Sequence, residues 1–321
     1  MREAAFVKQN YDRWQAFEEL LKDERHAPPD QLADLFIQVT DDLSFSRTQY
    51  PGSETTHYLN NLASKIHLKI YKNKKEDKNR FVTFWKYELP QLFYSAHKQL
   101  LYAFILFVVA ILIGIVSVHN DETFARLILG DAYVNMTLQN IEDGNPLGVY
   151  GKSNEADMFV GITLNNVMVS FRAFALGLFV SIGTGAILFY NGVMVGTFFT
   201  FLAREGYLFE SLGIVMLHGT LELSAIVIAG AAGFVMGNSI LFPGTYSRLE
   251  SFKRGAKKGL KIIIGLVPVF IAAGFIESFF TRYTFMHWSI KLSIILVSAG
   301  FIVYYFVIYP INLNKHVNRK D

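Results

Sequence analysis

The sequence predicts an all-α, polytopic membrane protein in which about six transmembrane helices follow an N-terminal cytoplasmic helical bundle. Long uncharged apolar segments recur after residue 99, the preceding residues carry helical periodicity, and basic residues gather between the apolar segments. We expect a cytoplasmic helical domain at 1–80, an amphipathic interfacial helix at 81–99, a transmembrane domain at 100–311 with an extracytoplasmic loop at 119–159, and a cytoplasmic tail at 312–321.

Residues 1–80 have the pattern of a small helical domain. The apolar residues of the first stretch lie at three- and four-residue steps: Val7, Tyr11, Trp14, Phe17 and Leu21. Similar stripes recur at 32–43 and 58–70, and Ser53 precedes the second of these as a helix cap. This part has no strand alternation and no glycine-rich phosphate loop, so we expect a helical bundle rather than an enzyme domain.

Residues 81–99 predict a different kind of helix. Its aromatic-rich face consists of Phe81, Phe84, Trp85, Leu89, Leu92 and Phe93. Such helices lie in the membrane interface, and Pro90 should kink this one before the first span. The alternative is a helix packed on the N-terminal bundle. Because no folded basic groove is evident, we expect the lysine-rich segment before this helix to bind anionic lipids rather than nucleic acid.

The membrane spans follow from length and hydropathy. The clear candidates are Leu100–Val118, Val160–Phe189, Gly213–Gly237, Leu260–Phe280 and Ile290–Ile311. A further apolar segment, Asn191–Ala203, would cover only roughly 20 Å as a helix, less than a bilayer of about 30 Å. It must therefore borrow flanking residues, or be broken or re-entrant.

Charge asymmetry predicts the orientation. Tyr71–Arg80, Arg248–Lys261 and Lys315–Lys320 are basic, whereas Asp121–Asp157 is acidic. The positive-inside rule places the three basic segments in the cytoplasm. Both termini then lie inside, so the number of crossings is even and Asn191–Ala203 has to cross. We expect a multi-pass protein of the cell inner membrane.

With the spans placed, the chain resembles the stage II sporulation protein M family over nearly its whole length. The stretches that carry the resemblance are Arg13–Asp23, Asp42–Pro51, Tyr58–Tyr71, Phe84–Phe93, Asn165-Asn166, Gly177, Gly183-Thr184, Asn191-Gly192, His218–Leu223 (HGTLEL) and Ile276-Glu277. The family member of spore formers resembles a membrane anchor for peptidoglycan-degrading enzymes. The resemblance therefore implies this architecture and an anchoring role.

Polar residues inside the spans form the candidate site. They are Asn165, Asn166, Arg172, Asn191, His218, Glu222 and Glu277. Ionisable side chains in hydrocarbon are costly, so each one marks a candidate site. His218 and Glu222 share a helix face. The predicted topology puts the ionisable residues in or close to the outer half of the membrane, so we expect one cluster in which Arg172 neutralises Glu222 or Glu277.

Three interpretations of this cluster compete. In the first, the polar residues bond helices together in a non-catalytic scaffold. In the second, they line the vestibule of a transporter or channel-like protein. In the third, they form the active centre of an intramembrane metallohydrolase, and His218, Glu222 and Glu277 would hold Zn²⁺. The metalloprotease pattern HExxH is absent and the chain has no Cys, so the first expectation is no cofactor.

The preferred interpretation is a non-catalytic scaffold or anchor for an envelope-associated complex. The cytoplasmic bundle would bind a partner, and the acidic loop would face envelope enzymes. The expected partners are membrane lipids, other membrane or envelope proteins, and a second copy of the chain. Gly192 and Gly196 form a small-xxx-small motif that would support such a homodimer.

Overall fold

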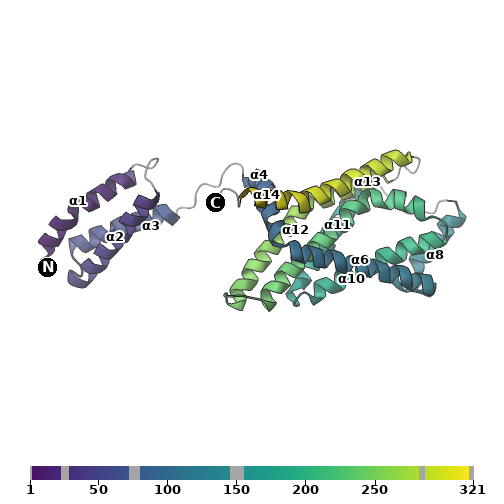
Figure 1. Cartoon of the computed structure of the whole chain (residues 1–321), viewed down its shortest axis with the longest axis horizontal. Helices are drawn as coiled ribbons and strands as arrows, with labels where there is room; N and C mark the ends of the chain where they lie inside the picture. Colours follow the sequence, from purple (N-terminus) through teal and green to yellow (C-terminus); the bar gives the residue numbers. More distant parts are fainter. Residues whose placement is uncertain (1, 23–28, 72–79, 145–154, 282–285, 318–321) are drawn as a thin grey trace. The chain divides into compact units, whose positions relative to one another are not determined.

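The computed structural model describes residues 2–22, 29–71, 80–144, 155–281 and 286–317. Within these ranges the chain is helical and contains no strand, which confirms the all-α prediction (Figure 1). Contacts divide the chain into two units, Met1–Arg80 and Phe81–Asp321. Most of the first basic segment (72–79), the centre of the acidic loop (145–154) and the end of the basic tail (318–320) lie outside the described residues.

The N-terminal unit consists of α1 (Glu3–Lys22), α2 (Pro29–Gln49) and α3 (Glu54–Tyr71). Its core residues are Phe6, Trp14, Phe17, Val39, Leu43, Leu59, Leu62 and Ala63. Ser53 caps α3 as predicted, accepting a hydrogen bond from the Thr56 amide at 3.2 Å. Tyr11, expected on the inward face, is 47% exposed.

A polar anchor ties α1 to α2 beside this core. Asp42 forms an ion pair with Arg13, and its Oδ2 also accepts a hydrogen bond from the indole nitrogen of Trp14 at 2.8 Å. The Trp14 side chain is 1% exposed, so this bond satisfies a buried donor. The three helices share the apolar core, and this polar contact joins α1 to α2.

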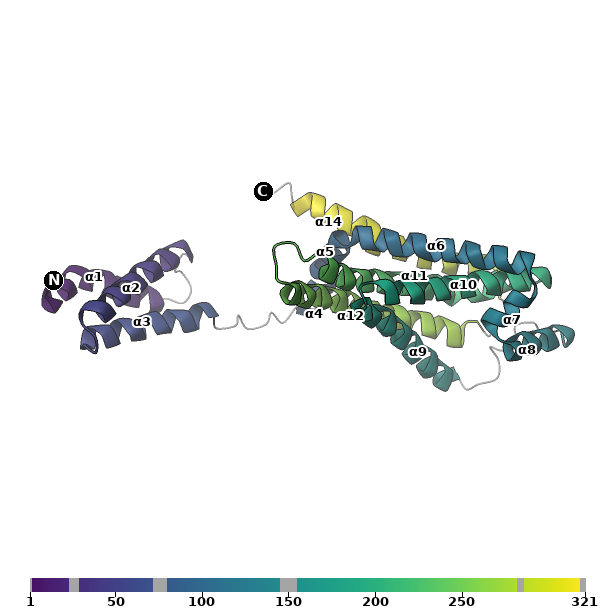
Figure 2. The same ribbon diagram turned by 90° about the horizontal axis from the view of Figure 1, so that it is seen from below.

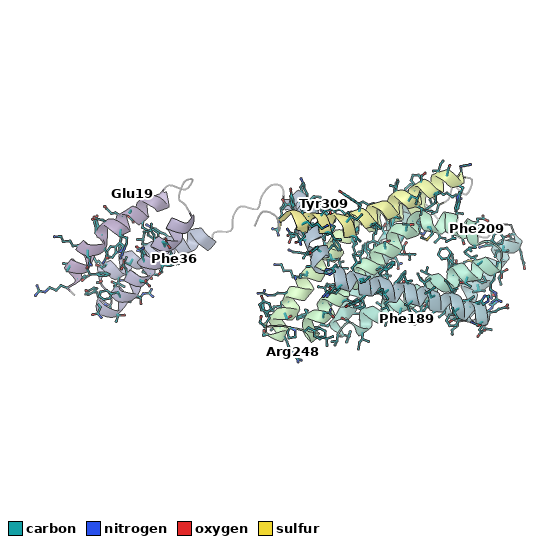
Figure 3. All side chains as sticks on the ribbon, viewed as in Figure 1. Glu19, Phe36, Phe189, Phe209, Arg248 and Tyr309 are labelled. Atoms are coloured by element: carbon teal, nitrogen blue, oxygen red, sulfur yellow. The ribbon has the colours of Figure 1, made fainter. Side chains whose placement is uncertain are left out.

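The membrane unit contains, in its described part, six helices long and apolar enough to cross a bilayer. They are α6 (His97–Asn120), α9 (Glu155–Ala175), α10 (Ile182–Arg204), α11 (Leu208–Leu241), α12 (Arg248–Phe279) and α13 (Trp288–Val303), the last continuing through η4 (Tyr304–Ile308) into α14 (Tyr309–Val317). Large apolar side chains such as Phe189 and Phe209 are exposed on this unit (Figure 3). Such a surface fits a lipid environment, and the protein is a multi-pass membrane protein.

Helix α11 lies at the centre of the unit. It packs against α6, α9, α10, α12 and α13, and α6 also packs along α10 (Figures 1 and 2). Its middle, from Ala225 to Gly233, is buried throughout. A helix that is apolar on all sides and surrounded by others positions its few polar residues inside the unit.

The boundary between the second and third crossings differs from the prediction. Val180 and Ser181 have positive φ angles of 54° and 70°, so the chain turns sharply after η3 (Leu176–Leu178). The predicted span Val160–Phe189 is therefore wrong at its end. Asn191–Ala203 is the later part of α10, whose 23 residues extend about 34 Å, enough to cross a bilayer.

The glycine motif on α10 packs inside the chain. A Cβ on Gly196 would lie 2.2 Å from the Ile111 carbonyl oxygen of α6, and one on Gly192 would lie 2.6 Å from the Ala110 Cβ. Close backbone approach at small residues is the usual use of such motifs. Because α6 of the same chain occupies this face, Gly192 and Gly196 do not support the expected homodimer, which stays a prediction.

Two segments predicted as connections are helical. Residues 119–159 were expected to form a loop, but Thr123–Leu129 and Asp131–Glu142 form α7 and α8, whose apolar side chains pack on the ends of α6, α10 and α11. The basic segment Arg248–Lys261 forms the first turns of α12. Ser247 caps it by accepting a hydrogen bond from the Glu250 amide at 3.3 Å, and lysine and arginine are good helix formers.

The interfacial segment belongs to the membrane unit and packs on it. It comprises α4 (Arg80–Thr83), the π-helical turn η1 (Phe84–Glu88) and α5 (Leu89–Ser95). Leu89 and Phe93 are buried, and the Phe93 ring contacts Phe306 at a centroid distance of 4.8 Å.

The π-helical turn leaves two carbonyl groups that the C-terminal helix satisfies. The Leu89 amide bonds to Phe84, one residue further back than in an α-helix, and Pro90 has no N–H to donate. The carbonyl oxygens of Trp85 and Lys86 thereby lose their usual donors. The hydroxyls of Tyr305 and Tyr309 donate to them at 2.6 and 2.9 Å.

Candidate intramembrane polar site

Helix α11 presents two ionisable residues on one face. His218 and Glu222 lie one turn apart. His218 is 5% exposed, whereas Glu222 is half-buried. One turn before His218, Ile214 packs in a small core with Ala125 of α7 and Val134 of α8. The site therefore lies toward the end of the membrane unit where α7 and α8 are found.

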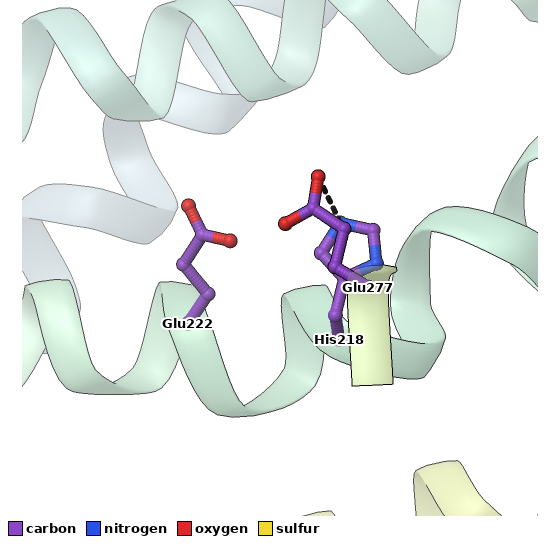
Figure 4. Close-up of side chains that lie close together, drawn as sticks. All are labelled: His218, Glu222 and Glu277. Carbon is purple, nitrogen blue, oxygen red and sulfur yellow. Dashed lines mark ion pairs between the residues drawn. The ribbon is translucent and has the colours of Figure 1, made fainter. Parts of the chain in front are cut away.

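Helix α12 brings the second carboxylate to this pair. Glu277 lies in the last turn of α12, and its Oε1 is 3.8 Å from Nε2 of His218. One ligand atom from each of His218, Glu222 and Glu277 lies within 4.8 Å of the other two. In Figure 4 the Glu277 carboxyl lies beside the His218 ring, on the same side of α11 as Glu222. Residues distant in sequence thus converge on one point.

Helix α9 is the third helix that contributes side chains to the polar site. Asn166 is 5% exposed and its side chain lies beside the Glu222 carboxyl. One turn earlier, Thr163 faces Gly274 of α12, where a Cβ would lie only 2.3 Å from the Thr163 hydroxyl. The missing side chain at Gly274 therefore lets α9 approach α12 one turn away from Glu277.

Arg172, the predicted counter-charge, is not at this site. Its side chain is exposed, and among the described residues it forms no ion pair with a carboxylate. The next residue, Ala173, accepts a hydrogen bond from the Thr184 hydroxyl at 2.7 Å, and Thr184 abuts Gly233. Gly233 lies about 16 Å along α11 from Glu222. Arg172 was expected at the depth of the cluster, but it lies in the last turn of α9, beyond the turn that carries Asn166.

Two of the predicted asparagines also lie elsewhere. Asn165 is exposed, and its Nδ2 approaches only the Oδ1 of Asn166, at 3.4 Å. Asn191 donates to the Ile187 carbonyl of its own helix at 2.8 Å. The structure therefore brings together Asn166, His218, Glu222 and Glu277, and leaves out Asn165, Arg172 and Asn191.

Buried hydroxyls near the site were missed. Thr163 and Ser170 lie on the same face of α9 as Asn166, and Ser278 follows Glu277 on α12. Their hydroxyl oxygens are buried and have no hydrogen-bond partner within the described part of the chain. The spacing of Thr163, Asn166 and Ser170 matches one helix face, and this polar stripe was readable from the sequence.

The arrangement offers one imidazole nitrogen and two carboxylate oxygens. These groups could hold a divalent metal ion, exchange protons, or simply bond the helices together. Glu222 is half-buried, and the Glu277 side chain is 13% exposed, so neither residue is fully enclosed by the helices.

Comparison with known proteins shows which family the chain belongs to. A family model described as stage II sporulation protein M matches residues 103–282, and another described as a domain of unknown function matches residues 4–72. No curated protein and no solved structure shows significant similarity. The first match covers more than half of the 321 residues and contains both the HGTLEL stretch and Glu277. The resemblance was expected over nearly the whole length, but the match covers the membrane part and leaves the motifs before residue 103 outside it. The chain therefore belongs to the stage II sporulation protein M family, as the motifs of its membrane part predicted.

Proposed function

We propose that this protein is a non-catalytic membrane scaffold, an anchor for an envelope-associated complex. The observation that carries the proposal is the separation of the chain into two units, each with its own apolar core. A bundle with a complete core can dock a partner while the membrane unit holds it at the bilayer. The family relationship supports an anchoring role.

The proposed orientation has both termini in the cytoplasm of a cell with this protein in its inner membrane. Lys261 of α12 forms an ion pair with Glu88 of η1, and Tyr309 reaches the Lys86 carbonyl. These contacts gather the basic start of α12, the interfacial segment and the C-terminal helix at one end of the membrane unit. The positive-inside rule favours the cytoplasm for this end.

The opposite end suits partners in the envelope. It carries α7 and α8 with exposed acidic residues, namely Asp121, Glu122, Asp131, Glu142 and Asp143. Polar, charged helices that pack on the ends of the spans offer a structured surface beyond the bilayer. The scaffold would thus present the N-terminal bundle to cytoplasmic partners and α7–α8 to envelope proteins, while its apolar flanks contact lipids.

Native complex size tests the scaffold proposal. Membranes containing the full chain, solubilised in mild detergent, should yield a complex larger than the chain itself. Deletion of residues 2–71 should reduce its size, provided that size-exclusion chromatography shows an intact membrane unit. Glu222→Gln should leave the complex unchanged. A complex that keeps its size and composition after the deletion would contradict the proposal.

A transporter or channel-like function is the second candidate. The partial exposure of Glu222 and Glu277 favours it, because carboxylates reachable from outside the helix bundle can exchange protons or ions. Purified chain in liposomes separates the candidates. A transporter should carry a proton or cation flux that Glu222→Gln abolishes while the chain stays folded, whereas a scaffold should show no such flux.

A further inference from the structure

We propose that His218, Glu222 and Glu277 bind a divalent transition-metal ion of the zinc type. Their ligand atoms already lie within 4.8 Å of one another, and the His218–Glu277 pair is 3.8 Å apart. Ligands at about 2.0–2.2 Å from a tetrahedral ion lie roughly 3.3–3.5 Å from each other. Closing the cluster onto an ion therefore requires side-chain shifts of about an ångström, which rotamers of the two glutamates can supply.

Charge balance supports a cation at this point. Two carboxylates lie inside a membrane-spanning bundle, where isolated charge is expensive. No Lys or Arg forms an ion pair with Glu222 or Glu277 in the ranges that the structure describes, and the predicted counter-ion Arg172 is exposed. A divalent ion would neutralise both carboxylates and leave the His218 imidazole as a neutral ligand.

Asn166 provides an independent indication of a ligand. Its side chain is about nineteen-twentieths buried, comes from a third helix and lies beside Glu222. Its Nδ2 faces the Glu222 carboxyl but makes no hydrogen bond of regular geometry to a described residue, although a buried amide N–H normally has a partner. An amide donor in this position can orient a ligating carboxylate or bond a metal-bound water, as partners of metal ligands commonly do.

The donor set selects the class of metal. Mg²⁺ and Ca²⁺ prefer sites built from oxygen ligands, whereas an imidazole suits zinc and its neighbours. The chain contains no Cys, so the site cannot be a thiolate site. Three protein ligands leave a fourth position, which a water molecule can fill.

Metal content of the full chain tests the proposal. The chain, purified in detergent, stripped with a chelator and exchanged into Zn²⁺, should retain about one ion per chain after desalting. His218→Ala, Glu222→Gln and Glu277→Gln should each lower the affinity by at least about tenfold. His119→Ala is the matched control, because His119 is an exposed imidazole on α6 that does not belong to the group of proposed ligands. Its metal content should equal that of the unmodified chain.

A second variant keeps the test decisive if a ligand substitution prevents folding. Glu277→Cys puts a thiolate at the proposed ligand position of a chain that has no other Cys. Loaded with Co²⁺, it should develop a thiolate-to-cobalt charge-transfer band that the unmodified chain lacks, a signal that a purely structural contact cannot give. Absence of both bound zinc and this band would overturn the proposal, as would zinc retention unaffected by all three ligand substitutions.

The identity of the metal and the scaffold role are tested separately. Retention of Mg²⁺ in preference to Zn²⁺ would overturn the transition-metal assignment. Complex size is measured on membranes and metal content on the purified chain, so the metal site can fail while the scaffold stands. Deleting residues 2–71 removes none of the proposed ligands, so loss of the complex in that variant leaves the metal test unaffected.

Discussion

Gly196→Ala should destabilise the membrane unit by forcing α6 and α10 apart. The new Cβ would lie 2.2 Å from the Ile111 carbonyl oxygen, about 1.2 Å closer than the 3.4 Å at which ordinary contact begins. The obstacle is helix backbone, which cannot rotate away as a side chain can. Overpacking of this kind costs about 1–3 kcal/mol, and we expect the free energy of unfolding to fall by that amount.

Gly185→Ala is the matched control on the same helix. Its Cβ would meet only Leu106 Cδ2, at 3.8 Å. The substitution should be neutral or stabilising by up to about 1 kcal/mol, the usual gain from glycine to alanine within a helix. Unfolding by SDS titration, followed by circular dichroism, measures both variants. Equal midpoints for Gly196→Ala and Gly185→Ala would refute the reasoning, as would a Gly196→Ala variant that changes only the oligomeric mass.

Two further predictions concern the ends of the membrane unit. Tyr305→Phe and Tyr309→Phe should each lower thermal stability by roughly 0.6–1 kcal/mol, because each leaves a carbonyl of the π-helical turn without a donor, whereas the exposed Tyr304→Phe should not. At the other end, hydrogen bonds from the hydroxyl and amide of Thr123 hold the pKa of Asp121 below its usual value. This stabilisation of α7 is present above the usual aspartate pKa and is lost as the pH falls through the lowered one. Carbon-13 NMR titration should show the pKa of Asp121 rising in Thr123→Val.

Most of the membrane architecture was predictable because hydrocarbon imposes strong constraints on a sequence. Apolar length gave six crossings, including one through the short segment Asn191–Ala203. The exact break at Val180–Ser181, where both residues have positive φ, was not predictable from the sequence. Non-glycine residues in that region are uncommon, so propensity argues against such a turn.

The site was partly predictable for a related reason. The spacing of His218 and Glu222 fixes them on one helix face regardless of tertiary structure. The approach of Glu277 depends on how α12 packs on α11, and the similar depths expected for Glu277 and His218 anticipated that the two residues meet. The prediction for Arg172 was wrong because its depth was counted from near residue 162, whereas α9 begins at Glu155 and carries Arg172 in its last turn. Helical-face reasoning applied to α9 would have included Thr163 and Ser170.

Site-specific thiol labelling tests the orientation on which the proposed function depends. Because the chain has no native Cys, Lys257→Cys on α12 and Asp131→Cys on α8 each introduce a unique, exposed thiol. A membrane-impermeant maleimide added to intact cells should label Asp131→Cys and leave Lys257→Cys unlabelled until the membrane is permeabilised. Labelling of Lys257→Cys in intact cells, with Asp131→Cys protected, would contradict the account.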